Sequence, residues 1–120
     1  MKISINDHRK VNAIQAEFSE MFPFLKVEFY AKPHKPGGAA SGKLIKYGSK
    51  TIAECRTIHN KGTLNISPEM SCMDLESSFR DVFGLKIKLF RKSGNEWLPV
   101  TLTEGWSLME QNSQGEALAR

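Results

Sequence analysis

The residues of this chain that come closest to a known chemical motif lie between Gly37 and Lys43. They have the G-x-x-x-x-G-K spacing with which loop amides surround phosphate groups in nucleotide-binding proteins. In that motif a serine or threonine follows the lysine and binds magnesium, whereas Leu44 follows here. The segment Lys-Pro-His-Lys-Pro also separates the glycines from the preceding strand pattern. We therefore do not expect nucleotide hydrolysis at this loop.

The lysines around these glycines are more informative. Residues 32–50 contain five lysines and no acidic residue, whereas the net charge of the whole chain is only +4, so the positive charge is localised. Such lysines, with basic residues of a later strand, could neutralise phosphates, and an exposed aromatic residue could stack on a base. The candidate binding residues are Lys32, Lys35, Lys43, Lys46, Lys88, Arg91 and Trp97.

Histidine, cysteine and serine do not form a catalytic or metal-binding pattern. His8, His34 and His59 lie in three unrelated segments, and zinc ligands normally come in closely spaced pairs. Cys55 and Cys72 are expected to be reduced thiols. The serines of residues 67–78 have no nearby histidine to activate them. We expect no enzymatic activity, no metal and no small-molecule cofactor.

Two similar patterns, residues 1–31 and 62–92, must position the candidate residues. Each reads as a short strand, a helix, a bend at Phe-Pro-Phe or Phe-Gly-Leu, and a second strand. In the first, Asn6 and Asp7 are expected to cap a helix with an apolar stripe, and the strand after Pro23 alternates apolar and polar residues. In the second, a helix is expected to start near Ser71 and to end at Gly84. The expected stripes are Val11, Ile14, Phe18 and Met21, and Leu75, Phe79, Val82 and Phe83.

The segment between the two patterns is predicted to be a flexible basic loop over residues 32–50, with a brief strand at 43–47. Thr51 and Glu54 form a capping-box pattern, which favours a short helix over 52–59, ended by Gly62. A hairpin strand over 52–59 is the alternative.

After the second pattern we expect a turn at 92–95 and a partner strand over 96–102, in which Pro99 indicates a sheet edge. A short final helix is expected near Ser107, followed by a loosely held tail after Gln111. Two β-α-β units can close into one antiparallel sheet with both helices on one face. The chain is therefore predicted to be a single α+β domain over 1–120, ferredoxin-like, with an added edge strand.

Residues 62–115 resemble a family of small, uncharacterised bacterial α+β proteins. The resemblance rests on Phe83-Gly84-Leu85, on Arg-Lys-Ser-Gly-Asn-x-Trp-Leu at 91–98, and on Trp-Ser-Leu-Met-Glu-Gln-Asn at 106–112. It implies no activity, cofactor or catalytic residue. The same half of the chain is similar, more weakly, to ubiquitin-like β-grasp modules, which implies a β-grasp alternative for the fold and a protein partner.

No apolar run approaches the roughly 20 residues that span a bilayer, and the first residues lack the apolar stretch of a secretory signal, so we expect a cytoplasmic protein with no membrane contact. The localised charge, the edge strand and the missing catalytic groups favour a module that binds a protein partner or itself through hairpin 86–102 and loop 32–50. The alternative is nucleic-acid binding through the lysine-rich loop.

Overall fold

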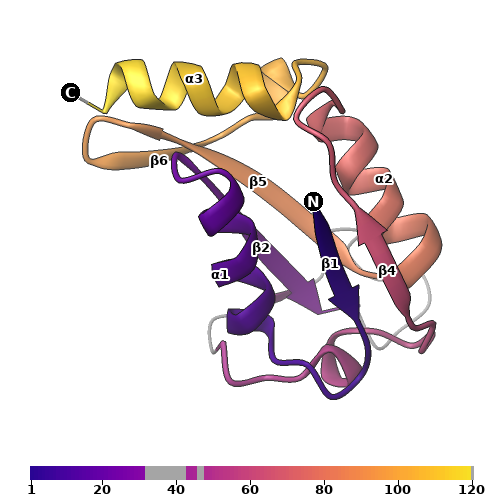
Figure 1. Cartoon of the computed structure of the whole chain (residues 1–120). Helices are drawn as coiled ribbons and strands as arrows, with labels where there is room; N and C mark the ends of the chain where they lie inside the picture. The colour runs from indigo at the N-terminus through magenta and orange to yellow at the C-terminus, as the bar shows by residue number, and fades with distance from the viewer. Residues whose placement is uncertain (32–42, 46–47, 120) are drawn as a thin grey trace.

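The computed structural model describes residues 1–31, 43–45 and 48–119 (Figure 1). These residues form an α+β fold with three α-helices and two antiparallel sheets. The elements are β1 (Lys2–Ile5), α1 (Val11–Met21), β2 (Leu25–Ala31), β3 (Lys43–Leu44), the 3-10 helix η1 (Ile52–Cys55), β4 (Gly62–Asn65), α2 (Cys72–Phe83), β5 (Lys86–Ser93), β6 (Glu96–Pro99), the 3-10 helix η2 (Thr101–Thr103) and α3 (Leu108–Leu118).

The strands are divided between a two-stranded ribbon, β1-β4, and a four-stranded sheet with the order β3-β2-β5-β6. The predicted single ferredoxin-like sheet is therefore not confirmed. One reason lies at the edge of β2, where Gln15 Nε2 of α1 donates to Val27 O (2.9 Å) and Ser19 Oγ donates to the carbonyl oxygen of Leu25 (3.3 Å). Helix side chains thus occupy the carbonyls that a further strand would need. The β-grasp alternative is not confirmed either, because β4 pairs with β1 and, within 62–119, only β5 and β6 pair with each other.

The two β-α-β units pair with each other about a common centre. In the ribbon, Ile3 lies opposite Leu64, its equivalent in the other unit. In the sheet, Glu28 lies opposite Lys88, which is again its equivalent. An approximate two-fold axis therefore passes through both pairs, with α1 and α2 on either side of the ribbon (Figure 1).

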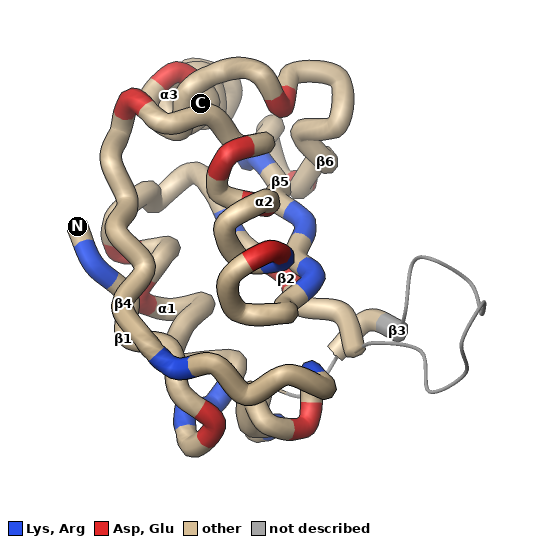
Figure 2. Tube along the Cα trace, turned by 90° about the vertical axis from the view of Figure 1, so that its right-hand side faces the viewer, with Lys and Arg blue, Asp and Glu red and all other residues tan. Residues whose placement is uncertain are grey.

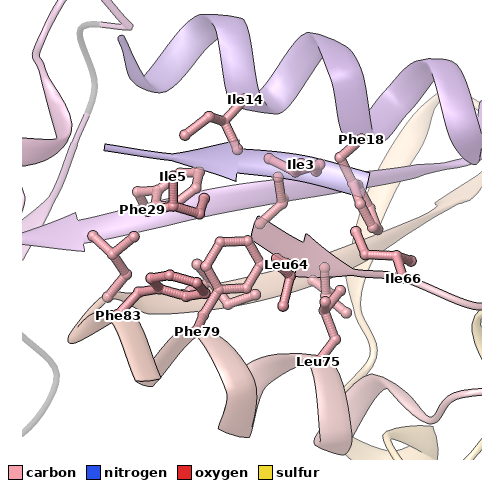
Figure 3. Packing of buried hydrophobic residues seen from close by; sticks show 14 of the residues in the cluster. Ile3, Ile5, Ile14, Phe18, Phe29, Leu64, Ile66, Leu75, Phe79 and Phe83 are labelled. Carbon is pink, nitrogen blue, oxygen red and sulfur yellow. The ribbon is translucent and has the colours of Figure 1, made fainter. Parts of the chain in front are cut away.

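The core fills the space between the ribbon and the four-stranded sheet (Figure 3). Ile3 and Ile5 of β1 and Leu64 of β4 are buried, as is Ile66 directly after β4. Phe29 of β2 and Phe79 of α2 meet edge to face, with ring centroids 5.8 Å apart. Burial of each such side chain contributes about 1.5–3 kcal/mol, so the ribbon holds the two helices against the sheet.

The ends of the first two helices differ in how well they were predicted. Helix α2 has the expected ends, since Ser71 Oγ accepts from the Asp74 backbone N–H and Gly84 adopts φ +64°. Helix α1 begins at Val11 with Lys10 as its N-cap residue, so the predicted caps are wrong. Asp7 is instead bound to Arg56, 49 residues away in the chain.

The helix predicted over 52–59 is confirmed only in part. The Thr51–Glu54 capping box is present, but it starts a 3-10 helix that ends at Cys55, and Arg56 is already extended. The predicted end at Gly62 is wrong, because Gly62 is the first residue of β4.

The C-terminal region is more ordered than expected. Strand β6 ends at Pro99 and is followed by η2, whereas α3 runs to Leu118. Ser107 caps α3 as predicted. The helix extends further because buried Gln111 donates to the Thr103 carbonyl (2.7 Å) and Gly115 packs closely on Phe24.

Candidate binding face of the four-stranded sheet

The four-stranded sheet has one buried face and one that none of the described helices covers. Apolar residues of β2 and β5 point into the core and alternate with partly or fully exposed residues. Figure 2 places the ribbon and the sheet on opposite sides of the molecule, with lysines along β2 and β5. We call the uncovered side the outer face. Its charged and aromatic members, among the residues that the structure describes, are Lys26, Glu28, Tyr30, Lys86, Lys88, Phe90, Lys92 and Trp97.

On the outer face, lysines and aromatic rings lie directly opposite each other on neighbouring strands. Lys26 of β2 is paired with Phe90 of β5, and Tyr30 of β2 is paired with Lys86 of β5. These two pairs are equivalent under the approximate two-fold axis. The Lys26 ammonium lies 5.4 Å from the centroid of the Phe90 ring, within the range of a cation–π interaction.

Trp97 extends this arrangement onto β6, where it lies opposite Lys92. Its ring is 5.0 Å from the Lys92 ammonium and 5.3 Å from that of Lys26. Lys88, next to Lys86 on the same face, lies 5.8 Å from the Tyr30 ring. Each of these rings is partly exposed and has at least one ammonium group over it.

The outer face is positively charged, with four lysines and a single carboxylate, Glu28. The Glu28 Oε1 atom lies 3.2 Å from the Lys26 ammonium. Partial burial, with a smaller contribution from Glu28, raises the pKa of Tyr30 above its usual value of 10.0, so this ring is uncharged at neutral pH. The face therefore presents three neutral rings among cations.

The structure brings together two of the seven residues selected from the sequence. Lys88 and Trp97 lie on the outer face. Arg91 points to the opposite face, where Nη1 donates to Gln111 Oε1 (3.1 Å) and the guanidinium lies 5.8 Å from the Trp106 ring. Lys43 begins β3, opposite Ala31. The other three, Lys32, Lys35 and Lys46, lie outside the described residues, as does most of the predicted loop 32–50.

The sequence selection missed Lys26 and Phe90. Their signal was available, because the residues at 26, 28 and 30 and at 86, 88, 90 and 92 alternate with buried apolar ones. The pairing of β2 with β5 could not be predicted from the sequence. It places the two rows of side chains next to each other on one surface.

A second cluster joins Asp7, Arg56 and His59. Arg56 has a fully buried side chain and donates to Asp7 Oδ1 (2.9 Å) and to the Phe83 carbonyl oxygen (2.8 Å). His59 Nδ1 lies 2.7 Å from Asp7 Oδ2. Hydrogen bonds from His59 and from Arg56 lower the pKa of Asp7. The cluster links the turn at residues 6–8 to the C-terminal end of α2, so its role is structural.

The two thiols are poor nucleophiles. Both are buried; burial raises the pKa of Cys55, and burial together with the charge of Glu76 raises the pKa of Cys72 to about 12. A thiol with so high a pKa is protonated at neutral pH. Within the described part of the chain, no three histidine, cysteine or acidic side chains gather closely enough to hold a metal ion.

No described helix has the length and apolar character needed to cross a membrane. Comparison of the chain with protein-family models, curated proteins and solved structures finds no match, so the resemblance in residues 62–115 stays a prediction.

Proposed function

We propose that this protein binds single-stranded nucleic acid on its outer face. The observation that carries the proposal is the repeated juxtaposition of a lysine and an aromatic ring, at Lys26–Phe90, Lys86–Tyr30 and Lys92–Trp97. Aromatic rings stack on bases whatever the sequence, and lysines attract the phosphates that join them.

A single strand fits this surface better than a duplex does. In a duplex the base faces are stacked on one another and only their edges are accessible, so rings on a flat sheet have nothing to stack on. The two symmetric pairs, centred on residues 26 and 30 of β2, are about 13 Å apart along the strand. A flexible strand crossing the sheet can place one base near each pair and its phosphates near the lysines.

The experiment is a titration of a fluorescently labelled 12-nucleotide single strand, as RNA and as DNA, at several salt concentrations. Stacking contributes about 1–3 kcal/mol per base, so Trp97→Ala is expected to weaken binding by about tenfold. Lys88→Gln is expected to weaken binding and to reduce the salt dependence of log K by about one.

The matched control is Lys2→Gln. Lys2 is an exposed strand lysine like Lys88, but it belongs to β1, on the other side of the molecule (Figure 2). If Lys2→Gln and Lys88→Gln weaken binding equally, the attraction is non-specific and the outer face is not the site. If no oligonucleotide binds at low salt, the proposal fails.

A second candidate is a protein partner, or a second copy of the chain, bound at the β5-β6 hairpin. Strand β6 forms an edge of the sheet, and three exposed apolar side chains belong to it or follow it closely: Leu98 (40 %), Leu102 (99 %) and Trp106 (39 %). A Leu102→Ser variant is expected to lose such a complex, measured as mass in solution or as capture of the partner, and to bind oligonucleotides as the wild type does.

A further inference from the structure

We propose that Glu28 makes the outer face prefer strands that contain guanine; this inference rests on the nucleic-acid binding proposed above. Among the described residues of the outer face, Glu28 is the only acidic one, and all the other charged residues are lysines. It lies at the centre of the face, opposite Lys88 and between the two lysine–aromatic pairs. A carboxylate in the middle of a phosphate-binding surface weakens the non-specific attraction of phosphates.

Among the equivalent positions of β2 and β5 on the outer face, that of Glu28 is the one where the charge is reversed. Under the approximate two-fold axis, Lys26 corresponds to Lys86 and Tyr30 to Phe90, so charge and ring character are kept at both pairs. Glu28 corresponds to Lys88, and here the charge is reversed. The otherwise symmetric face therefore has an acceptor on one side of its centre and a donor on the other.

A base stacked on Tyr30 or on Phe90 can present its edge to this carboxylate. Tyr30 is two residues from Glu28 on the same strand and face, about 6.6 Å away, and Phe90 is its diagonal neighbour across the strands, about 7–8 Å away. The Glu28 side chain is 24 % exposed. The salt bridge to Lys26 involves Oε1, and the carboxylate has further lone pairs on both oxygens.

Guanine is the base that matches a carboxylate. An ionised carboxylate only accepts hydrogen bonds. The Watson–Crick edge of guanine carries two adjacent donors, N1–H and the N2 amino group, which can bind the two carboxylate oxygens side by side. Adenine and cytosine present one amino group beside an acceptor nitrogen, and uracil and thymine present one N–H between two carbonyls, so each brings an acceptor against the carboxylate. Single-stranded bases are commonly read on this edge.

The test compares labelled 10-nucleotide strands that differ at one central position, with guanine, adenine, cytosine or uracil in a uridine background. A parallel DNA set has a thymidine background and shows whether the preference depends on the sugar. Bidentate contacts discriminate by about 5- to 150-fold, and because Glu28 is partly solvated we expect guanine to be favoured about fivefold over uracil or thymine.

Two variants test whether the guanine preference depends on Glu28. Glu28→Gln is expected to bring the guanine-to-uracil ratio close to one and to tighten binding to the uridine-only strand, because a negative charge is removed. Glu96→Gln removes the same charge from the opposite face, since Glu96 is paired with Ser93, and is expected to keep the wild-type ratio.

A wild-type ratio of one, or a ratio that persists in Glu28→Gln, overturns the guanine preference while leaving nucleic-acid binding in place. Failure of every strand to bind overturns both proposals.

Discussion

The ion pair between Asp7 and Arg56 allows a sharp prediction about stability. Replacing Asp7 with Asn keeps the shape of the side chain but leaves the buried Arg56 guanidinium without its counter-charge. Breaking a buried pair by removing one partner typically costs 3–5 kcal/mol, but the Asp7 side chain is 30 % exposed and water partly compensates. We expect the free energy of unfolding to fall by about 2–3 kcal/mol, which corresponds to a decrease in Tm of roughly 10 °C for a chain of this size.

The assay is denaturant unfolding followed by circular dichroism, and the control is Asp81→Asn. Asp81 also binds an arginine at 2.9 Å, but the side chains of Arg80 and Asp81 are 63 % and 64 % exposed. Removing this surface pair is expected to have no measurable effect. Equal losses of unfolding free energy in the two variants would contradict this prediction, because it depends on Arg56 being buried and Arg80 being exposed.

The same pair predicts a pH dependence with a definite sign. The pKa of Asp7 is lowered in the folded protein from the usual value of 3.8, so its contribution is complete above that value and is lost as the pH falls through the folded pKa. Acidification should therefore narrow the difference in stability between the wild type and Asp7→Asn. A difference that stays constant from pH 6 to pH 2 would contradict this interpretation.

Three further predictions concern the helices and their ends. Gly84→Ala places a Cβ against the Ile58 side chain at φ +64°, whereas Gly94→Ala meets the same backbone strain at φ +59° with no atom within 4 Å of its Cβ. In denaturant unfolding we expect Gly84→Ala to lose more than about 1 kcal/mol and Gly94→Ala to lose about 1 kcal/mol. Equal losses would show that contact with Ile58 is unimportant. Cys72 should resist a thiol reagent at pH 8 in the folded protein and react after unfolding; rapid labelling of the native thiol would show that it is accessible. Glu76→Gln should raise stability at pH 7, with a gain that disappears on acidification, because burial and a neighbouring carboxylate raise the pKa of Glu76; a loss at pH 7 would contradict this.

Several local signals in the sequence predicted local structure correctly. The cap at Ser71, the C-terminal glycine of α2 and the edge position of Pro99 each follow from one or two residues and are confirmed. The apolar stripe of α2 was right except at Val82, which is 51 % exposed, whereas the adjacent Phe83 is buried.

Long-range pairing was the part that the sequence could not predict. Asp7 reads as a helix cap when only its neighbours are considered, and its partner Arg56 is distant in the chain. Likewise, alternation predicts that each strand has a polar face, but not that the polar faces of β2 and β5 are adjacent. Arg91 shows the same difficulty, since one step along a strand moves a side chain from the outer face to the opposite one.

The exchange of strands between the two units affects how the chain folds. Strands β1 and β2 of the first unit pair with β4 and β5 of the second, and neither unit pairs its own two strands. Apart from the two-residue pairing of β2 with β3, a nascent first unit thus has no β-ladder to form until residues from Gly62 onward have been synthesised. The entropy of closing these long loops must be overcome before the ladders between the units contribute. We expect a high contact order for this α+β chain, slow and highly cooperative folding, and no stable intermediate in which only one unit is formed.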